Sequence, residues 1–471
     1  NGAKILVQGD AAFVSQSDIL LSDNAANRWV ILGHSHFQTT GSIDIGSAGT
    51  FDTSELSVQA ANAIIAEHDS VHLRDLTILG DFELSSNTII EDFAGATIRI
   101  DGDLSLRSGT ISLADGASDV LTVNGNAEFL ASSGNITIAQ AGTVTLGSLF
   151  ASGTTITVFE DDAMQIQSID AIGNAQLTST DAVTDVTNAR ITAPGNLVVT
   201  GTSITLADNA IDVLHVVGDS QFVATSGDVN LGPTGDVQLG TFSAAGVNVT
   251  LEEDDSTQLM TIDATGDLRV TSVSTVTDNP RASIRVTGNA TIDGSSITLA
   301  DNATETLSIG GLGTFTANAG DVLIADAGTV TLGVLAASGT NVTVFEDDAM
   351  HIQSIAATGN AQLTSGGLVS DATNARITTQ GNLVATGTSI TLADNLMDVL
   401  HVDGDSRFVA TSGDVNFGPA GDVRLGTFSA SANNIAIQED DTTDLRFVDA
   451  RDLLETTSSE NIRTVNDAGI V

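Results

Sequence analysis

The chain has 471 residues, a formal net charge of −45 and no cysteine. So large an acidic surplus repels the phosphates of nucleic acids and anionic lipids, and the lack of cysteine excludes disulfides and thiol chemistry. A hydrophobic content of 41% provides for a large core. No run of about 18 apolar residues is present, so we expect no membrane-spanning segment. Because of the negative charge, we also expect no nucleic-acid partner.

An eight-residue segment recurs along the whole chain. Its copies are SDILLSDN at 17–24, GTISLADG at 109–116, TSITLADN at 202–209, SSITLADN at 295–302 and TSITLADN at 388–395. A glutamate that opens an acidic turn recurs every 93 residues, as Glu67, Glu160, Glu253, Glu346 and Glu439. Repetition of this kind predicts one continuous repeat body rather than a series of unrelated domains.

The repeat divides the chain into five units that follow the end of a preceding repeat at 1–16. The predicted units are 17–109, 110–202, 203–295, 296–388 and 389–471. Residues 159–179 match residues 345–365 at 18 of 21 positions but match residues 252–272 at only 10. The units therefore alternate between two types, and the duplicated element is a pair of units.

Short segments of alternating polarity fill each unit. Examples are TVTLG at 143–147, TITVF at 155–159 and DVQLG at 236–240, and the pattern is typical of half-buried strands. In the TSITLADN segment it places Ile204 and Leu206 on the inner face and Thr205 on the outer one.

Gly-Asn and Gly-Asp pairs recur at regular intervals, beginning for example at Gly173, Gly195 and Gly218. We expect the glycine to supply backbone freedom and the Asn or Asp side chain to hydrogen-bond its own turn. The predicted fold is all-β, an elongated parallel β-solenoid with roughly four coils in each 93-residue unit.

One phenylalanine recurs at an equivalent position of every unit, always four residues after a glycine. These predicted core residues are Phe37, Phe129, Phe222, Phe315 and Phe408. Aromatic residues make up only 4% of the chain, so we expect each of these rings to be the one large side chain at its level of the core.

The acidic turns offer two interpretations. Clustered carboxylates are the hard oxygen ligands that Ca²⁺ prefers, whereas acidic runs in turns are more often simply solvated. The candidate Ca²⁺ ligands are Glu160, Asp161, Asp162, Glu253, Asp254, Asp255, Glu346, Asp347, Asp348, Glu439, Asp440 and Asp441. No other cofactor is expected.

Nothing in the sequence indicates catalysis. The charged residues recur from unit to unit, Lys4 is the only lysine, and no long insertion interrupts the repeat. A catalytic groove on a β-helix needs a cluster of functional groups that occurs once. We therefore predict that the protein is not an enzyme.

The order SITLADN, DVLHV, GDSQF, GDVQLGTF and EEDDS resembles the repeats of very large secreted bacterial proteins. These are the filamentous-haemagglutinin-like and autotransporter-like adhesins and related giant surface proteins. The resemblance covers the whole chain and implies export, a right-handed parallel β-helix, and a role as a stalk, fibre or adhesive surface. It provides no catalytic residues.

We therefore expect a structural extracellular protein, a stiff solenoid that forms part of a fibre, stalk or surface appendage. Neither end has a polar capping segment, so we expect either that the natural chain continues in both directions or that its ends contact copies of itself. The alternative is an adhesin that presents one face to glycans or partner cells. Trp29, which replaces a leucine found in the other units, is the candidate for such a face. Divalent cations are the remaining expected partners.

Overall fold

The computed structural model describes residues 2–22, 24–139, 141–325, 327–418 and 420–470. It divides into two compact units, Asn1–Gly240 and Thr241–Val471. We call these the first and second units from here on, and we call the 93-residue segments repeats. All regular elements in the described residues are strands, which confirms the all-β prediction. In this part of the chain no helix is long and apolar enough to cross a membrane.

The first unit contains strands of three to twelve residues. They are β1 (Lys4–Val7), β2 (Ala11–Val14), β3 (Ile19–Leu21), β4 (Arg28–Gln38), β5 (Ser42–Ile45), β6 (Thr50–Ala60), β7 (Asn62–Ala66), β8 (Val71–Ile78), β9 (Phe82–Ser85), β10 (Ile89–Asp92), β11 (Thr97–Ile100), β12 (Leu104–Ser108), β13 (Thr110–Leu113), β14 (Val120–Ala131), β15 (Ile136–Ile138), β16 (Thr143–Gly153), β17 (Ile156–Glu160), β18 (Met164–Ala171), β19 (Ala175–Ser179), β20 (Val183–Ala193), β21 (Leu197–Gly201), β22 (Ile204–Leu206), β23 (Val213–Ala224) and β24 (Val229–Leu231).

Strand β25 (Asp236–Gly246) includes the boundary between the units, and the other strands of the second unit follow it. They are β26 (Val249–Glu253), β27 (Thr257–Ala264), β28 (Leu268–Ser272), β29 (Thr275–Val286), β30 (Ala290–Gly294), β31 (Ser296–Leu299), β32 (Thr306–Ala317), β33 (Val322–Ile324), β34 (Thr329–Gly339), β35 (Val342–Glu346), β36 (Met350–Ala357), β37 (Ala361–Ser365), β38 (Val369–Thr379), β39 (Leu383–Gly387), β40 (Ile390–Leu392), β41 (Val399–Ala410), β42 (Val415–Phe417), β43 (Asp422–Glu439), β44 (Thr443–Ser458) and β45 (Ile462–Ile470).

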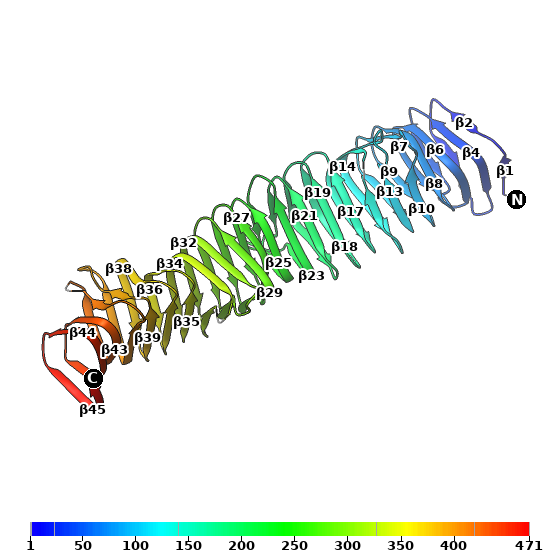
Figure 1. The fold of residues 1–471 in the computed structure, drawn as a ribbon. Helices are drawn as coiled ribbons and strands as arrows, with labels where there is room; N and C mark the ends of the chain where they lie inside the picture. Colours follow the sequence, from blue (N-terminus) through cyan, green and yellow to red (C-terminus); the bar gives the residue numbers. More distant parts are fainter. Residues whose placement is uncertain (1, 23, 140, 326, 419, 471) are drawn as a thin grey trace. The chain divides into compact units, whose positions relative to one another are not determined.

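In each unit the strands pair in parallel with the equivalent strands of the next coil, so each unit is a parallel β-solenoid, as predicted (Figure 1). One stack of the first unit contains Ile111, Ile136, Ile156, Ala175 and Leu197 in register. Its successive coils differ in length, the longest running from Ile111 to Ile136 and the shortest from Ile156 to Ala175. Uneven coil length places extra residues in the turns and leaves the strands in register.

The alternation expected from the sequence determines which side chains form the core. Ile204 and Leu206 are fully buried, whereas Thr205 between them is partly exposed. The recurring phenylalanines Phe37, Phe129, Phe222, Phe315 and Phe408 are each 0% exposed. Phe129 lies in register between Leu106 and Ala151 of the adjoining coils. The expectation of one large side chain at each level was wrong for two of them, because Phe37 contacts Phe13 and Phe51, and Phe408 contacts Phe417 and Phe428. Burial of these rings removes a large apolar surface from water.

The Gly-Asn and Gly-Asp pairs form ladders between coils. The backbone N–H of Asn196 donates to Asn174 Oδ1 at 2.8 Å, and that of Asp219 donates to Asn196 Oδ1 at 2.9 Å. In the second unit, Asn382 N–H donates in the same way to Asn360 Oδ1 at 2.9 Å. The expectation that these side chains bond their own turn was therefore wrong. Each one satisfies a backbone donor of the next coil.

The glycines of these pairs are required for a different reason from the one expected. A Cβ atom at Gly195 would lie 2.3 Å from Asn174 Oδ1, and one at Gly218 would lie 2.4 Å from Asn196 Oδ1. Neither glycine has a positive φ angle. Glycine is needed here because the side chain of the previous coil occupies the space that a Cβ would take.

Candidate functional site

The glutamates that open the acidic turns lie in the core. Glu67, Glu160, Glu253, Glu346 and Glu439 are at most 4% exposed. The view that these turns are wholly solvated is therefore wrong for their first residue. The signal that could have revealed this is the strand alternation, because Glu160 follows the inward-facing Ile156 and Val158 with period two.

Each buried glutamate whose backbone donor is described here accepts a hydrogen bond from an N–H fourteen residues earlier. Leu146 donates to Glu160 Oε1 at 2.8 Å, and Leu332 donates to Glu346 Oε1 at 2.9 Å. Leu425 and Glu439 repeat the arrangement at 2.9 Å. The carboxylate completes the hydrogen bonding of a strand where it turns.

The following aspartate also binds backbone. Asp161 Oδ2 accepts the N–H of Val144 at 2.7 Å, and Asp347 Oδ2 accepts that of Val330 at 2.7 Å. The second oxygen of Glu160 has no N–H or O–H donor, and it faces the carboxylate of Asp162. Burial first, and then the charges of Asp162 and Asp161, raise the pKa of Glu160 to about 9.

The acidic turns therefore have fewer free oxygens than their composition indicates. In these turns, Glu160 and Glu346 are buried next to Asp162 and Asp348, and their pKa values are raised to about 9 and about 8. Ca²⁺ binding at the twelve turn residues stays a prediction. Groups of three carboxylates whose oxygens could share one ion are found elsewhere among the described residues.

Four such groups recur at intervals of 93 residues, and we call them the carboxylate clusters. They are Asp92–Asp115–Asp119, Asp185–Asp208–Asp212, Asp278–Asp301–Glu305 and Asp371–Asp394–Asp398. In each cluster, one carboxylate oxygen from every member lies within 4.8 Å of the others. Sequence reasoning missed them because the first two members are one coil apart.

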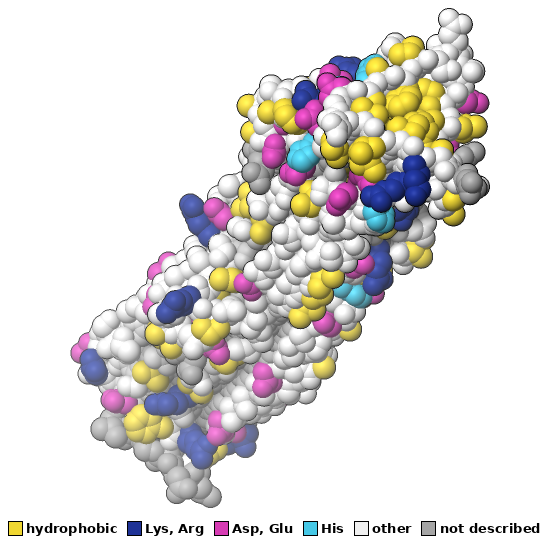
Figure 2. Space-filling model, turned by 90° about the vertical axis from the view of Figure 1, so that its right-hand side faces the viewer, with side chains coloured by type: hydrophobic (Ala, Val, Ile, Leu, Met, Phe, Trp, Pro, Cys, Tyr) yellow, Lys and Arg dark blue, Asp and Glu magenta, His cyan; other side chains and the backbone are white. Residues whose placement is uncertain are grey.

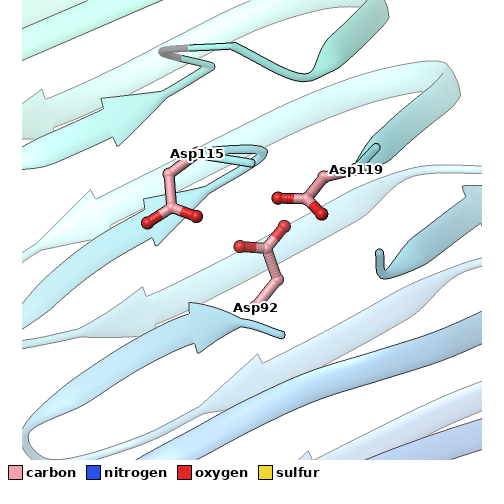
Figure 3. A group of neighbouring side chains, drawn as sticks. All are labelled: Asp92, Asp115 and Asp119. Carbon is pink, nitrogen blue, oxygen red and sulfur yellow. The ribbon is translucent and has the colours of Figure 1, made fainter. Parts of the chain in front are cut away.

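In the first cluster, Asp92 is the last residue of β10, and Asp115 and Asp119 lie in the turn between β13 and β14. Figure 3 shows the three carboxylates pointing toward one another. Asp92 Oδ2 accepts the N–H of Ala114 at 2.7 Å. Asp119 Oδ1 and Oδ2 accept the N–H groups of Gly95 and Gly116, each at 2.6 Å.

The turn that carries two members of each cluster has an unusual backbone. Ala114 has a φ of 56°, in the left-handed region that residues with a Cβ seldom adopt. Its equivalents Ala207, Ala300 and Ala393 have φ values of 57°, 56° and 55°. In each case the N–H of this alanine donates to the first aspartate of the cluster. That hydrogen bond holds the turn against the cluster.

The other clusters repeat this geometry with one addition. Asn209 follows Asp208, and its side-chain N–H₂ donates to Asp208 Oδ1 at 2.6 Å and to Asp212 Oδ2 at 3.0 Å. The first cluster has Gly116 at the position of Asn209 and therefore lacks this amide. It is the cluster with the least compensation of its negative charge.

The third member of each cluster is buried, and the first is largely so. Asp119, Asp212, Glu305 and Asp398 are at most 1% exposed, and Asp278 is 8% exposed. Burial, followed by repulsion from the neighbouring carboxylates, raises the pKa of Asp92, Asp185 and Asp371 to about 6 and that of Asp278 to about 7. None of the ion pairs in the described part of the chain includes a cluster residue.

Each unit has a surface groove, and part of the lining of the two grooves is equivalent. In the second unit it has a volume of about 550 Å³, and Asn318, Ser338 and Thr358 contribute to its lining. A groove of about 390 Å³ in the first unit is lined in part by Ser132 and Ser152, the equivalents of Asn318 and Ser338 two repeats earlier. The two grooves therefore share part of their polar lining, but Ile172 of the first unit stands at the position of Thr358.

The remaining surface is mixed. Figure 2 shows acidic, basic and hydrophobic side chains on the visible face, among other side chains and backbone. Trp29 lies in β4, where it is partly buried and packs 5.8 Å from the ring of Phe13. Phe13 in turn stacks on Phe37 at 4.9 Å. Trp29 thus belongs to a partly exposed aromatic group that packs on the buried Phe37, and a binding role for it stays a prediction.

Residues 246–306 match a family model described as repeats of unknown function (DUF5649). This segment contains the cluster of Asp278, Asp301 and Glu305 and the buried Glu253. No curated protein and no solved structure matches the chain. The match and the fold agree in describing a repeat-rich β-helical protein.

Proposed function

We propose that the chain is a structural repeat segment of an exported fibre, stalk or surface appendage. One observation carries the proposal: the distinctive features recur from repeat to repeat. The buried glutamates, the carboxylate clusters and the core phenylalanines return every 93 residues. Selection for one local activity would maintain one site, whereas a structural role along the whole chain requires the same interactions in every repeat.

The physical basis of that role is the hydrogen bonding between coils. Parallel strand pairing and the Asn/Asp ladders join each coil to the next within a unit. A solenoid built in this way gains stability from each nearest-neighbour interface, so repeats can be added without a new core. In this proposal the chain has no catalytic step, and its partners are copies of itself.

The likeness to filamentous-haemagglutinin-like and autotransporter-like proteins supports an extracellular location within the same proposal. Their repeats are also strand-and-turn patterns of this kind. Export is compatible with a 471-residue chain that has no cysteine and relies on hydrogen-bond ladders and packing for its stability.

Electron microscopy of the native material, combined with antibody labelling of intact cells, tests this proposal. We expect surface-exposed filaments with an axial repeat of one or two repeat units, which is roughly 20 or 40 Å at about 4.8 Å for each coil. Labelling that appears only after the cells are lysed would refute the extracellular location. Isolated particles at native concentration would refute the fibre.

The groove of the second unit favours one second candidate, an adhesin that binds glycans. Hydroxyl and amide groups such as Asn318, Ser338 and Thr358 are able to hydrogen-bond sugar hydroxyls. Binding to a panel of soluble glycans tests this function. Thr358→Arg should fill the groove and abolish binding, whereas a substitution of the same kind at exposed Asp263 should have no effect.

A further inference from the structure

Each carboxylate cluster contains a buried oxygen that no donor satisfies. In the described residues, Oδ1 of Asp92, Asp185, Asp278 and Asp371 has no hydrogen-bond partner. Asp278 is only 8% exposed, and its Oδ2 is occupied by the N–H of Ala300 at 2.8 Å. A buried carboxylate oxygen without a partner is costly, and two more carboxylates next to it add to that cost. A cation bound in the cluster would give Oδ1 of Asp278 a partner and offset the repulsion among the three carboxylates.

The need to accept backbone N–H groups does not explain why the cluster residues are negatively charged. Asn27 is the equivalent of Asp119 in the first repeat, and its Oδ1 accepts the N–H of Ala3 at 2.8 Å. Asp119 Oδ1 accepts the N–H of Gly95 in the same way. A neutral amide thus provides the capping interaction, and the carboxylates of the four clusters serve some further purpose.

We propose that each of the four carboxylate clusters binds one Ca²⁺ ion. Ca²⁺ binds oxygen at about 2.3–2.6 Å, so two oxygens on one ion are at most about 5 Å apart. One oxygen from each member lies within 4.8 Å of the others, so all three can contact one ion. Mg²⁺ requires a near-ideal octahedron and gives up its waters reluctantly, so three protein carboxylates suit Ca²⁺ better.

The ion would join two coils. Ile90, two residues before Asp92, pairs in register with Ile111 of the next coil, and the turn after Ile111 carries Asp115 and Asp119. The bound ion therefore connects the end of one coil to the turn of the next, beside the N–H of Ala114 that makes the same connection. This inference holds whether the chain forms a fibre or binds glycans.

Equilibrium dialysis and calorimetric titration of the whole chain with Ca²⁺ test the proposal. The protein is first stripped with a chelator and held in about 0.15 M salt, which screens diffuse attraction to the negative surface. We expect four Ca²⁺ ions bound for each chain, one for each cluster, with Mg²⁺ a weak competitor. The second members Asp115, Asp208, Asp301 and Asp394 are exposed, so their replacement leaves the buried, backbone-bonded carboxylates of the turns in place.

The variant Asp115→Asn/Asp208→Asn/Asp301→Asn/Asp394→Asn should lose all four sites, and Asp301→Asn alone should lose one. The matched control changes four exposed aspartates outside the clusters, Asp101, Asp170, Asp263 and Asp403, to asparagine. It should keep all four sites. Equal binding by the two fourfold variants would overturn the proposal, and so would binding that does not saturate or that Mg²⁺ matches.

Discussion

The backbone N–H of Leu146 donates a 2.8 Å hydrogen bond to Oε1 of Glu160, a side chain that is 0% exposed. Leu332 and Glu346 form the same pair two repeats later. One carboxylate oxygen is thus satisfied by the backbone, while the other faces the carboxylate of Asp162. Two acidic groups so placed are most stable when they share a proton.

Glu160→Gln should reduce the loss of stability at alkaline pH. The pKa of Glu160 rises from 4.5 to about 9 on folding, so between these values the folded chain keeps a proton that the unfolded chain has lost. The free energy of unfolding therefore falls as pH rises through this range, and it is unaffected by this group below pH 4.5. Urea unfolding with chelator present should show the variant more stable than the parent by at least about 2 kcal/mol at pH 9 and little different at pH 5.

Glu67→Gln provides the comparison. Both Glu67 oxygens accept backbone N–H groups, from Thr53 at 3.1 Å and Asp69 at 2.6 Å, and its pKa is raised only to about 7. An amide has one acceptor oxygen, so Glu67→Gln loses one of these hydrogen bonds, and its gain in stability at pH 9 should be smaller than that of Glu160→Gln. General repulsion among the surface carboxylates affects all variants alike. Identical dependence of stability on pH for Glu160→Gln and the parent would contradict the raised pKa of Glu160.

Gly195→Ala should destabilise the first unit although the φ angle of Gly195 suits alanine. The new Cβ would lie 2.3 Å from Asn174 Oδ1 and disrupt the ladder that satisfies the N–H of Asn196. We expect a loss of about 1–3 kcal/mol in urea unfolding. Gly9→Ala is the control, because nothing lies within 4 Å of its Cβ position. Equal losses of stability in the two variants would show that the backbone freedom of glycine, and not the space taken by the Asn174 side chain, makes glycine necessary.

Phe315→Ala should lower the free energy of unfolding by about 3–5 kcal/mol, because it leaves a cavity in the core of the second unit. Phe315 is 0% exposed, whereas Phe345 on the outer face of β35 is 37% exposed. Phe345→Ala should therefore cost much less. Chemical unfolding of the two variants measures the difference, and similar losses would mean that Phe315 does not fill the core.

Asp301→Asn should stabilise the protein when Ca²⁺ is removed and destabilise it relative to the parent when Ca²⁺ is present. With chelator present it removes one of three neighbouring negative charges, so the melting temperature should rise. In millimolar Ca²⁺ the parent is stabilised by binding and the variant is not, so the variant should melt lower. Each kcal/mol corresponds to roughly 2–4 °C. Asp263→Asn should change neither value, and a variant that melts higher in both buffers would contradict the calcium site.

The fold could be predicted from the sequence because its information is local and repeated. The period-two alternation around Ile204 and Leu206 indicates a strand and its inner face, and the repeat provides the parallel stacking. The burial of Phe222 follows from the same pattern. These features depend on neighbouring residues, so reading the chain in order is sufficient to find them.

The carboxylate clusters could not be predicted in this way, because their members come from two coils and lie together only if the coil between them has the right length. Asp185 and Asp208 lie about one coil apart in the sequence, and turns of uneven length determine whether this spacing brings them together. The 93-residue recurrence of Asp92, Asp185 and Asp278 was visible and could have indicated them. The acidic turns are visible in the sequence because their charged residues are adjacent. The burial of Glu160 is not, because it depends on a contact with Leu146 of another strand.

A 93-residue repeat does not contain a whole number of coils, so equivalent strands of successive repeats lie in different stacks. This affects how the gene can lengthen by duplication. In the first unit, β3 and β22 belong to one series of paired strands, through β5, β7, β9, β12, β14, β16, β18 and β20. The copy between them, β13, belongs to another series, which continues through β15, β17, β19 and β21. Duplication of one repeat therefore moves each motif to a neighbouring series, and duplication of two restores it. Recombination in steps of two repeats would preserve every side-chain ladder, as the close match between residues 159–179 and 345–365 indicates.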